Sequence, residues 1–177
     1  MTGLARLIRS RRGSAAVEMA LVTPLLLALG IGSVELGNFM LDQHRLTKSV
    51  RDATRYAARA PFSAFSACTS AASNVASLAT GVTNLVRTGQ LSGGTDQLPN
   101  WGNAASSVTV QMRCSTAQVG GQTLTGLYTG NNTATVGAAV VVIVTGTLRY
   151  QPLVKAFGFT GEGFDLYAKE EAPVSGI

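Results

Sequence analysis

Residues 14–33 read SAAVEMALVTPLLLALGIGS, a stretch of twenty residues whose only charged member is Glu18. As an α-helix this stretch would rise about 30 Å, which matches the thickness of a bilayer's hydrocarbon core. Arginines at positions 6, 9, 11 and 12 precede it, and a flank of mixed charge follows it. The positive-inside rule then places residues 1–13 in the cytoplasm and residues 34 onward outside it. The sequence therefore predicts a single-pass transmembrane helix at 14–33 behind a basic cytoplasmic leader at 1–13.

A cleaved secretory signal peptide is the alternative, because such peptides also have a basic start and an apolar middle. The apolar span is longer than a typical signal core, however. No small-x-small cleavage motif is followed by a break in the helical pattern. We therefore favour a retained membrane anchor.

The helical pattern continues beyond the predicted membrane span. Apolar residues recur at steps of three, four and occasionally six until Pro61, where an α-helix cannot continue. These residues are Leu36, Met40, Leu46, Val50, Ala53 and Ala57. We expect one helical rod of about 70 Å over residues 14–60, disturbed at Pro24, with residues 34–60 forming an exported helical stalk.

Residues 61–177 predict a small exported α+β domain. After an Ala/Ser-rich segment at 61–73, apolar residues at helical spacing predict a short helix that Gly89 stops. Trp101 is interpreted as a core residue beneath the loop that follows. Alternating or β-branched runs predict strands from Ser107, at 138–150 and at 164–168, with a hairpin at Gly120–Gly121 and Gly130–Asn132 between them. The predicted fold is an antiparallel sheet of about three to five strands, with 138–150 as its central strand.

The charge distribution argues against nucleic-acid binding. The net charge is +5, but outside the leader ten of the fourteen Lys and Arg residues remain against nine Asp and Glu. Five of these ten lie at 45–59, a run that is interpreted either as a solvated face or as a docking strip for acidic lipid or a partner. The domain itself is neutral, so we expect no nucleic-acid partner.

The residue inventory also disfavours enzymatic and metal-binding functions. There is one histidine, His44, and there are two cysteines, which is too few for the usual zinc sites. The acidic residues are scattered, and no glycine-rich phosphate loop, Ser/His/Asp set or pair of catalytic acids is visible. We therefore expect neither an enzyme nor a cofactor-binding protein.

Cys68 and Cys114 lie in the part of the chain that is predicted to be exported. An even number of cysteines in an oxidising compartment predicts a disulfide between them. Closing this loop would contribute roughly 3–4 kcal/mol in the chain-entropy model. Two independent buried thiols are the alternative.

Glu18 is the most informative single residue. A carboxylate within an apolar span costs roughly 2–3 kcal/mol even on lenient insertion scales, so it usually has a partner. Glu18 stands at the fifth position after Gly13, counting Ser14 as the first. A basic leader, a glycine, a small residue, a glutamate at the fifth position and an apolar helix together resemble the type IV prepilin family. This resemblance implies that a membrane-embedded prepilin peptidase cuts the Gly13–Ser14 bond. Glu18 of one subunit would then neutralise the new amino terminus of a neighbouring subunit.

Four stretches narrow the resemblance to the TadE-like family of tight-adherence (Flp-type) pilus loci. They are RGSAAVEMALV at 12–22, TPLLL at 23–27, GSVELG at 32–37 and RDATRYAARA at 51–60. The resemblance implies a membrane-inserted pseudopilin (minor pilin) that acts in assembly of a pilus or a related secretion machine. The implied partners are the bacterial inner membrane, a prepilin peptidase, other pilins or pseudopilins and the pilus assembly platform. A membrane-anchored exported scaffold or binding protein that does not enter a filament is the alternative.

Three residues of the helix are candidates for assembly within the membrane: Glu18, Pro24 and Glu35. Glu35 lies about 25 Å from Glu18 along the helix, near the outer membrane interface. It is interpreted either as an interfacial charge that faces lipid headgroups or as a residue that pairs in assembly.

Overall fold

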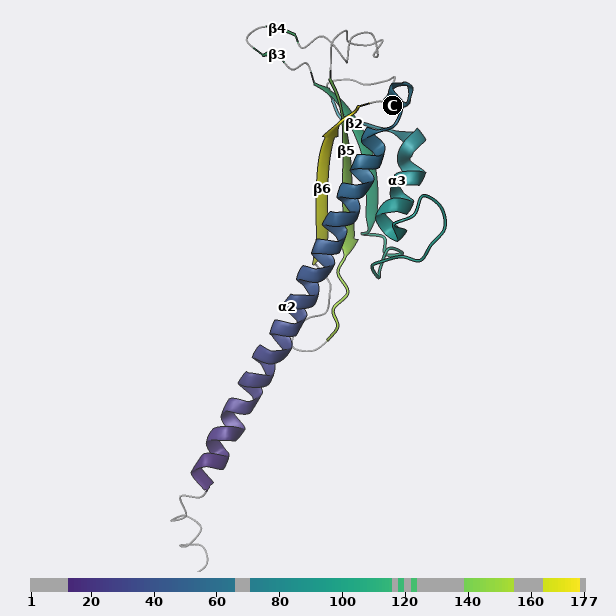
Figure 1. Ribbon diagram of the computed structural model, residues 1–177. Helices are drawn as coiled ribbons and strands as arrows, with labels where there is room; N and C mark the ends of the chain where they lie inside the picture. The colour runs from purple at the N-terminus through teal and green to yellow at the C-terminus, as the bar shows by residue number, and fades with distance from the viewer. Residues whose placement is uncertain are drawn as a thin grey trace, which may run out of the picture. The chain divides into compact units, whose positions relative to one another are not determined.

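The computed structural model describes residues 13–65, 71–115, 118–119, 122–123, 139–154 and 164–175. In chain order these residues form α2 (Ser14–Ala58), the 3₁₀ helix η2 (Phe62–Phe65), β1 (Ser73–Asn74), α3 (Ala76–Thr88), β2 (Ser107–Ser115), β3 (Gln118–Val119), β4 (Gln122–Thr123), β5 (Ala139–Arg149) and β6 (Asp165–Pro173) (Figure 1). A long apolar helix is followed by a short helix and an antiparallel sheet of four strands in the order β1-β2-β5-β6. This architecture confirms the predicted α+β class.

The chain divides into two compact units. The helix unit comprises Met1–Phe39 and Pro152–Thr160, and the sheet unit comprises Met40–Gln151 and Gly161–Ile177. α2 contributes to both units, because the division falls within it. The sequence predicts a leader at 1–13, a membrane span at 14–33, a stalk at 34–60 and an exported domain at 61–177. These four segments stay predictions.

α2 is one continuous helix of 45 residues that contains Pro24 and ends two residues before the predicted end at Ala60. From Leu46 onward its apolar stripe is buried, and Leu46, Val50, Ala53 and Ala57 are fully inaccessible to solvent. This spacing places one face of the helix in the core of the sheet unit. Leu36 and Met40, which belong to the same apolar stripe in the sequence, are exposed.

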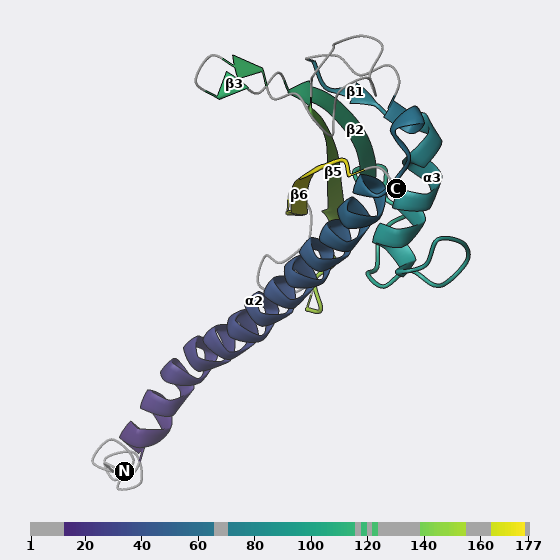
Figure 2. The ribbon, with the colours of Figure 1, turned by 45° about the horizontal axis from the view of Figure 1, so that its top comes forward.

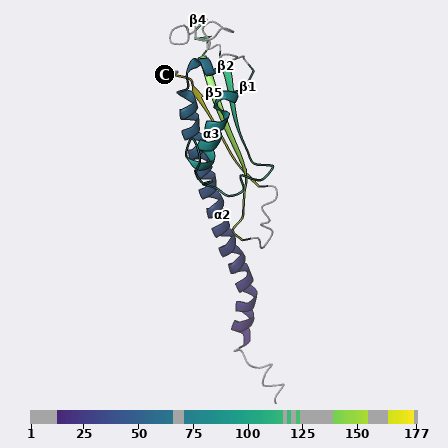
Figure 3. The ribbon, with the colours of Figure 1, turned by 90° about the vertical axis from the view of Figure 1, so that its right-hand side faces the viewer.

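The core of the sheet unit lies on one face of the sheet. The even-numbered residues of β2 and β5 pair across the strands at Val110↔Val144, Met112↔Val142 and Cys114↔Val140, and all six side chains are buried. α2 and α3 lie on the same side of the sheet (Figure 3). Alternate residues of a strand point to opposite faces of the sheet. The alternation of apolar and polar residues in β2 therefore places its apolar side chains on this packed face.

The opposite face of the sheet carries charged side chains that pair with one another, both between strands and within β6. Arg149 Nε lies 3.1 Å from Asp165 Oδ1. Glu171 accepts from Arg113 at 3.1 Å and from Lys169 at 2.8 Å. Ile143 stands in register between Gln111 and Glu171 and is buried. An antiparallel sheet with one packed and one polar face is typical of this fold class.

α3 packs beside β1 and β2 and ends where the sequence predicts (Figure 2). Val82 and Val86 of α3 are buried. Gly89 adopts φ 74° in the left-handed region, and its N–H donates to Leu85 O at 3.0 Å. Glycine takes this backbone conformation without a side-chain penalty, which makes it a common helix stop. Trp101 is buried, as expected for a core residue beneath the loop.

Some short elements differ from the prediction. The 61–73 segment includes η2, whose Phe65 is buried, and its last residue begins β1, a fourth strand that the sequence does not predict. β1 has two residues, which is too few to show an alternating pattern. Phe164, the first residue of the strand predicted at 164–168, precedes β6 and is exposed. β3 and β4 pair with each other. Gly120–Gly121 and Gly130–Asn132, where the sequence predicts a hairpin, lie outside the described residues.

Candidate functional site: the exposed N-terminal part of α2

The predicted processing point lies at the start of α2. Gly13 directly precedes the first helical residue, Ser14, and no described residue beyond its chain neighbours has an atom within 4 Å of the position that a Cβ on Gly13 would take. Residues 1–12 of the leader lie outside the described residues. Cleavage of the Gly13–Ser14 bond stays a prediction.

Glu18 lies on the exposed first turns of α2. It is four residues from Ser14, a rise of about 6 Å along the helix axis. Within the described part of the chain, no hydrogen bond or ion pair is formed by its carboxylate. A partner for this charge would therefore come from outside the described chain.

The surface around Glu18 is apolar and exposed. The large apolar side chains of residues 17–29 are between 44% and 73% exposed. The helix is long enough and apolar enough to cross a membrane. An apolar surface of this extent is not stable in water, so lipid or partner helices must cover it.

The hydroxyl groups of Thr23 and Ser33 are satisfied within the helix. Thr23 Oγ1 donates to Met19 O at 2.6 Å, next to Pro24, and Ser33 Oγ donates to Gly30 O at 2.8 Å. Gly30, Gly32 and Gly37 have no atoms within 4 Å of the positions where a Cβ would stand. Internal bonds of this kind suit a helix in lipid, and the glycines allow another helix to approach closely.

Glu35 is buried within the helix unit. Its side chain is 2% exposed, and its carboxylate accepts N–H bonds from Leu153 at 3.2 Å and Val154 at 3.1 Å. The carboxylate is therefore turned toward this segment of its own chain, and the interfacial and assembly roles considered for Glu35 stay predictions. Main-chain N–H donors carry no side-chain signature, so these two partners could not be found from the sequence.

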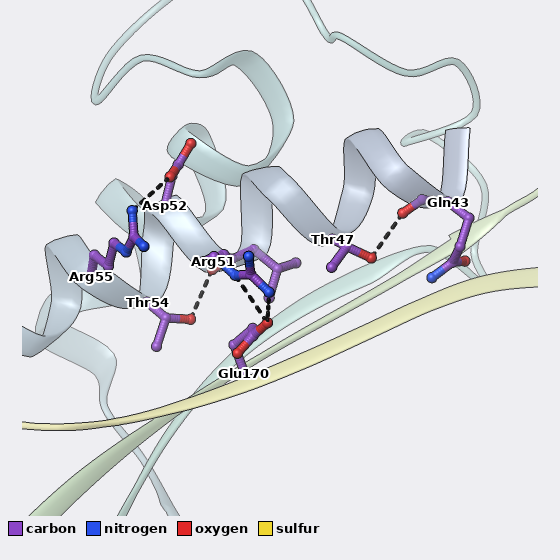
Figure 4. Close-up of polar contacts among 8 residues, drawn as sticks. Gln43, Thr47, Arg51, Asp52, Thr54, Arg55 and Glu170 are labelled. Atoms are coloured by element: carbon purple, nitrogen blue, oxygen red, sulfur yellow. Dashed lines mark hydrogen bonds and ion pairs between the residues drawn. The ribbon is translucent and has the colours of Figure 1, made fainter. Parts of the chain in front are cut away.

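The basic run at 45–59 lies largely on the solvated face of α2, within the sheet unit (Figure 4). Arg51 pairs with Glu170 of β6 at 3.2 Å, and Arg55 lies 4.0 Å from Asp52. The side chains of both arginines are more than half exposed. This arrangement favours the solvated face over a docking strip, and exposed pairs of this kind contribute little to stability.

Gln43 was not singled out by the sequence, yet it blocks an edge of the sheet. Its Nε2 donates to Tyr167 O at 2.7 Å, and its Oε1 accepts from Tyr167 N at 3.3 Å. The side-chain amide therefore occupies the outer edge of β6 as a neighbouring strand would. Covering an edge strand in this way protects it from pairing with another chain.

Asp42 is a buried acid on α2, and Arg45 Nη1 lies 3.3 Å from its carboxylate. Burial raises the pKa of Asp42 above its usual value of 3.8, and the charge of Arg45 offsets only part of this effect. The carboxyl group of Asp42 therefore holds its proton more tightly in the folded chain than in the unfolded chain.

Asp42→Asn is expected to change how stability depends on pH. In the wild type, the contribution of Asp42 to stability falls as pH rises from 3.8 through its raised pKa in the folded chain. The side-chain amide of the variant does not titrate, so its stability should not fall over this pH range. At neutral pH the variant should therefore be more stable than the wild type. Denaturant unfolding of both proteins from acid to neutral pH measures the difference. Parallel curves over this range would contradict the assignment.

A groove of about 490 Å³ lies between α2 and the end of α3, and Arg45, Lys48, Asp52 and Gln97 contribute to its lining. Asp52 is the one carboxylate in this lining, so the groove holds no pair of catalytic acids. Among the described residues, no three His, Cys, Asp or Glu side chains gather as a metal site. The exposed part of α2 is therefore the more informative functional surface.

Cys114 is buried on β2 and is not a free thiol. Cys68 lies outside the described residues. The disulfide between Cys68 and Cys114 therefore stays a prediction.

Comparison with known proteins finds a similarity in the N-terminal segment. Residues 13–55 match the family model described as TadE-like protein. No curated protein and no solved structure matches the chain. The matched segment contains Glu18, Pro24 and Glu35, which the sequence motifs single out. The match confirms the resemblance, and residues 13–55 of this chain are a TadE-like segment.

Proposed function

We propose that this chain is a membrane-inserted TadE-like pseudopilin, a minor pilin that acts in assembly of a tight-adherence (Flp-type) pilus or a related secretion machine. The observation that carries the proposal is the bare apolar surface of α2, which contains one exposed carboxylate, Glu18, a single turn from Ser14. The match of residues 13–55 to TadE-like proteins supports it.

In this proposal the helix is anchored in the bacterial inner membrane with its N-terminus in the cytoplasm and the sheet unit outside. A prepilin peptidase cuts the Gly13–Ser14 bond and leaves a cationic amino terminus on Ser14. This terminus then meets Glu18 of a neighbouring pilin or pseudopilin, which compensates both charges in an apolar environment. The assembly platform and the other pilins are the partners, and no nucleic acid takes part.

Glu18→Gln tests the pairing of charges. The variant should insert and be cleaved as the wild type is, because an amide is easier to bury than a carboxylate. It should lose crosslinking to the other pilins, because the partner's amine stays uncompensated at a cost on the order of a few kcal/mol per contact. The measurement is crosslinking and co-purification, read beside the membrane level and the N-terminal residue by intact mass.

Thr23→Val is the matched control within the same span. The Thr23 hydroxyl bonds only to its own helix at Met19 O, so this variant should crosslink normally. Normal crosslinking by Glu18→Gln would contradict the charge pairing. A chain that still begins at Met1 when the peptidase is present would contradict processing and favour the anchored-scaffold alternative.

A further inference from the structure

The helix unit contains a second apolar feature besides the span itself. Glu35 follows Ser33, the last residue of the predicted span, by two positions, a rise of about 3 Å. Its neighbours Val34 and Leu36 are 59% and 61% exposed. The exposed apolar surface of the helix therefore does not end at Ser33.

The two hydrogen bonds to Glu35 hold a segment distant in sequence at this level of the helix. The carboxylate accepts from the main-chain N–H groups of Leu153 and Val154, and Pro152 beside them is buried. Because both bonds reach main-chain atoms, they fix the height of the segment and leave the Leu153 side chain free to point outward.

Leu153 points away from the protein, with 63% of its surface exposed. The Glu35 carboxylate, which holds this segment, is turned inward and 2% exposed. Lys155 follows two positions later and lies outside the described residues. The surface at this level thus presents Val34, Leu36 and Leu153. These three described side chains are apolar and continue the exposed surface of the span, and such a surface is suited to lipid and not to water.

Membrane dimensions indicate what covers Leu153. The hydrocarbon core is about 30 Å thick and the bilayer with its headgroups about 40–45 Å, so each interfacial layer is several ångströms deep. A residue held about 3 Å beyond the end of the span lies within the outer layer. We propose that Leu153 contacts the outer interface of the lipid bilayer, with Glu35 as the positioning residue that holds it there.

This inference rests on the proposed membrane insertion of α2, so the test addresses the two separately. The chain has a single tryptophan, Trp101, which is buried in the sheet unit. Leu153→Trp and Leu27→Trp add an indole at the proposed contact and inside the span. Leu91→Trp replaces an exposed leucine of the sheet unit and is the matched control. Each full chain is reconstituted in vesicles of phosphatidylcholine and phosphatidylglycerol, with or without bromine on the acyl chains.

Brominated lipid should strongly quench the emission of the tryptophan added at position 27. It should quench the emission of the tryptophan added at position 153 by about half, because interfacial indoles lie at headgroup level. The wild type and Leu91→Trp should be unaffected. Quenching at position 27 without quenching at position 153 would overturn the lipid contact and leave membrane insertion standing. A lack of quenching at position 27 would overturn membrane insertion and the inference with it.

Two further outcomes would also overturn the lipid contact. A blue-shifted emission at position 153 that resists brominated lipid and depends on the protein-to-lipid ratio would indicate a second copy of the chain at this surface. Equal quenching at positions 91 and 153 would indicate a general attraction of the added indole to lipid.

Adding Glu35→Ala to the Leu153→Trp chain tests the positioning role. Without the carboxylate the segment loses both anchoring bonds, and the quenching at position 153 should fall toward that of Leu91→Trp. Quenching at position 27 should stay unchanged, because the span is not altered. Undiminished quenching at position 153 would show that Glu35 does not position it.

Discussion

Gly146→Val is expected to lower the free energy of unfolding of the sheet unit by about 1–3 kcal/mol. Gly146 interrupts the β-branched run of β5 and faces α2. A Cβ added here would stand 2.9 Å from Val50 Cγ2 and 3.3 Å from Leu46 Cδ1. Both neighbours are fully buried, so neither can move aside without disturbing the core. Valine would add two further methyl groups to this contact between helix and sheet.

The measurement is thermal or denaturant unfolding of the full chain in detergent, followed by circular dichroism. Thr147→Val is the matched control, because Thr147 is the next residue of β5, lies on the opposite face and is only partly buried. We expect the control to stay within about 0.5 kcal/mol of the wild type, as surface substitutions usually do. Equal stability of Gly146→Val and the control would contradict the close packing of α2 on β5.

Glu35→Ala is expected to release the segment at Leu153 and Val154 from α2. Both N–H groups are part-buried and would lose their acceptor, which costs up to about 1–3 kcal/mol for a donor that water does not reach. The amide hydrogens of these two residues should then exchange about 10- to 100-fold faster, since 1.4 kcal/mol corresponds to a factor of ten. Hydrogen exchange resolved to single residues measures this effect.

Glu35→Gln is the matched control for this prediction. Glutamine keeps one side-chain oxygen that accepts an N–H bond, whereas its amino group only donates. Exchange at Leu153 and Val154 should therefore lie between those of the wild type and Glu35→Ala. Unchanged exchange in Glu35→Ala would contradict the anchoring role, because the carboxylate would then contribute nothing measurable to these two bonds.

Much of the secondary structure follows from local patterns. The α2 stripe from Leu46 to Ala57 and the stop of α3 at Gly89 depend on residues close together in the chain. The β-branched run predicts β5 as a central strand, and β5 lies between β2 and β6. β1 escapes prediction because a strand of two residues has no measurable periodicity.

The N-terminal segment of the candidate site can also be predicted from the sequence. A lone carboxylate in an apolar span, at a fixed distance after a glycine, is a local feature that a linear pattern records. The match of residues 13–55 to TadE-like proteins rests on the same local information. Glu18 and Pro24 could therefore be named without the fold.

The sequence by itself determined the α+β class, the apolar helix and its TadE-like motif, because each depends on composition, spacing and periodicity within one segment. Only the tertiary structure decided which groups bind Glu35 and why a glycine stands at position 146. The partners of Glu35 are main-chain N–H groups 118 and 119 residues away, and such groups are identical at nearly every position of a chain. Gly146 is required because α2 approaches β5 closely there, and the distance between two elements is set by how they pack and not by the sequence of either one.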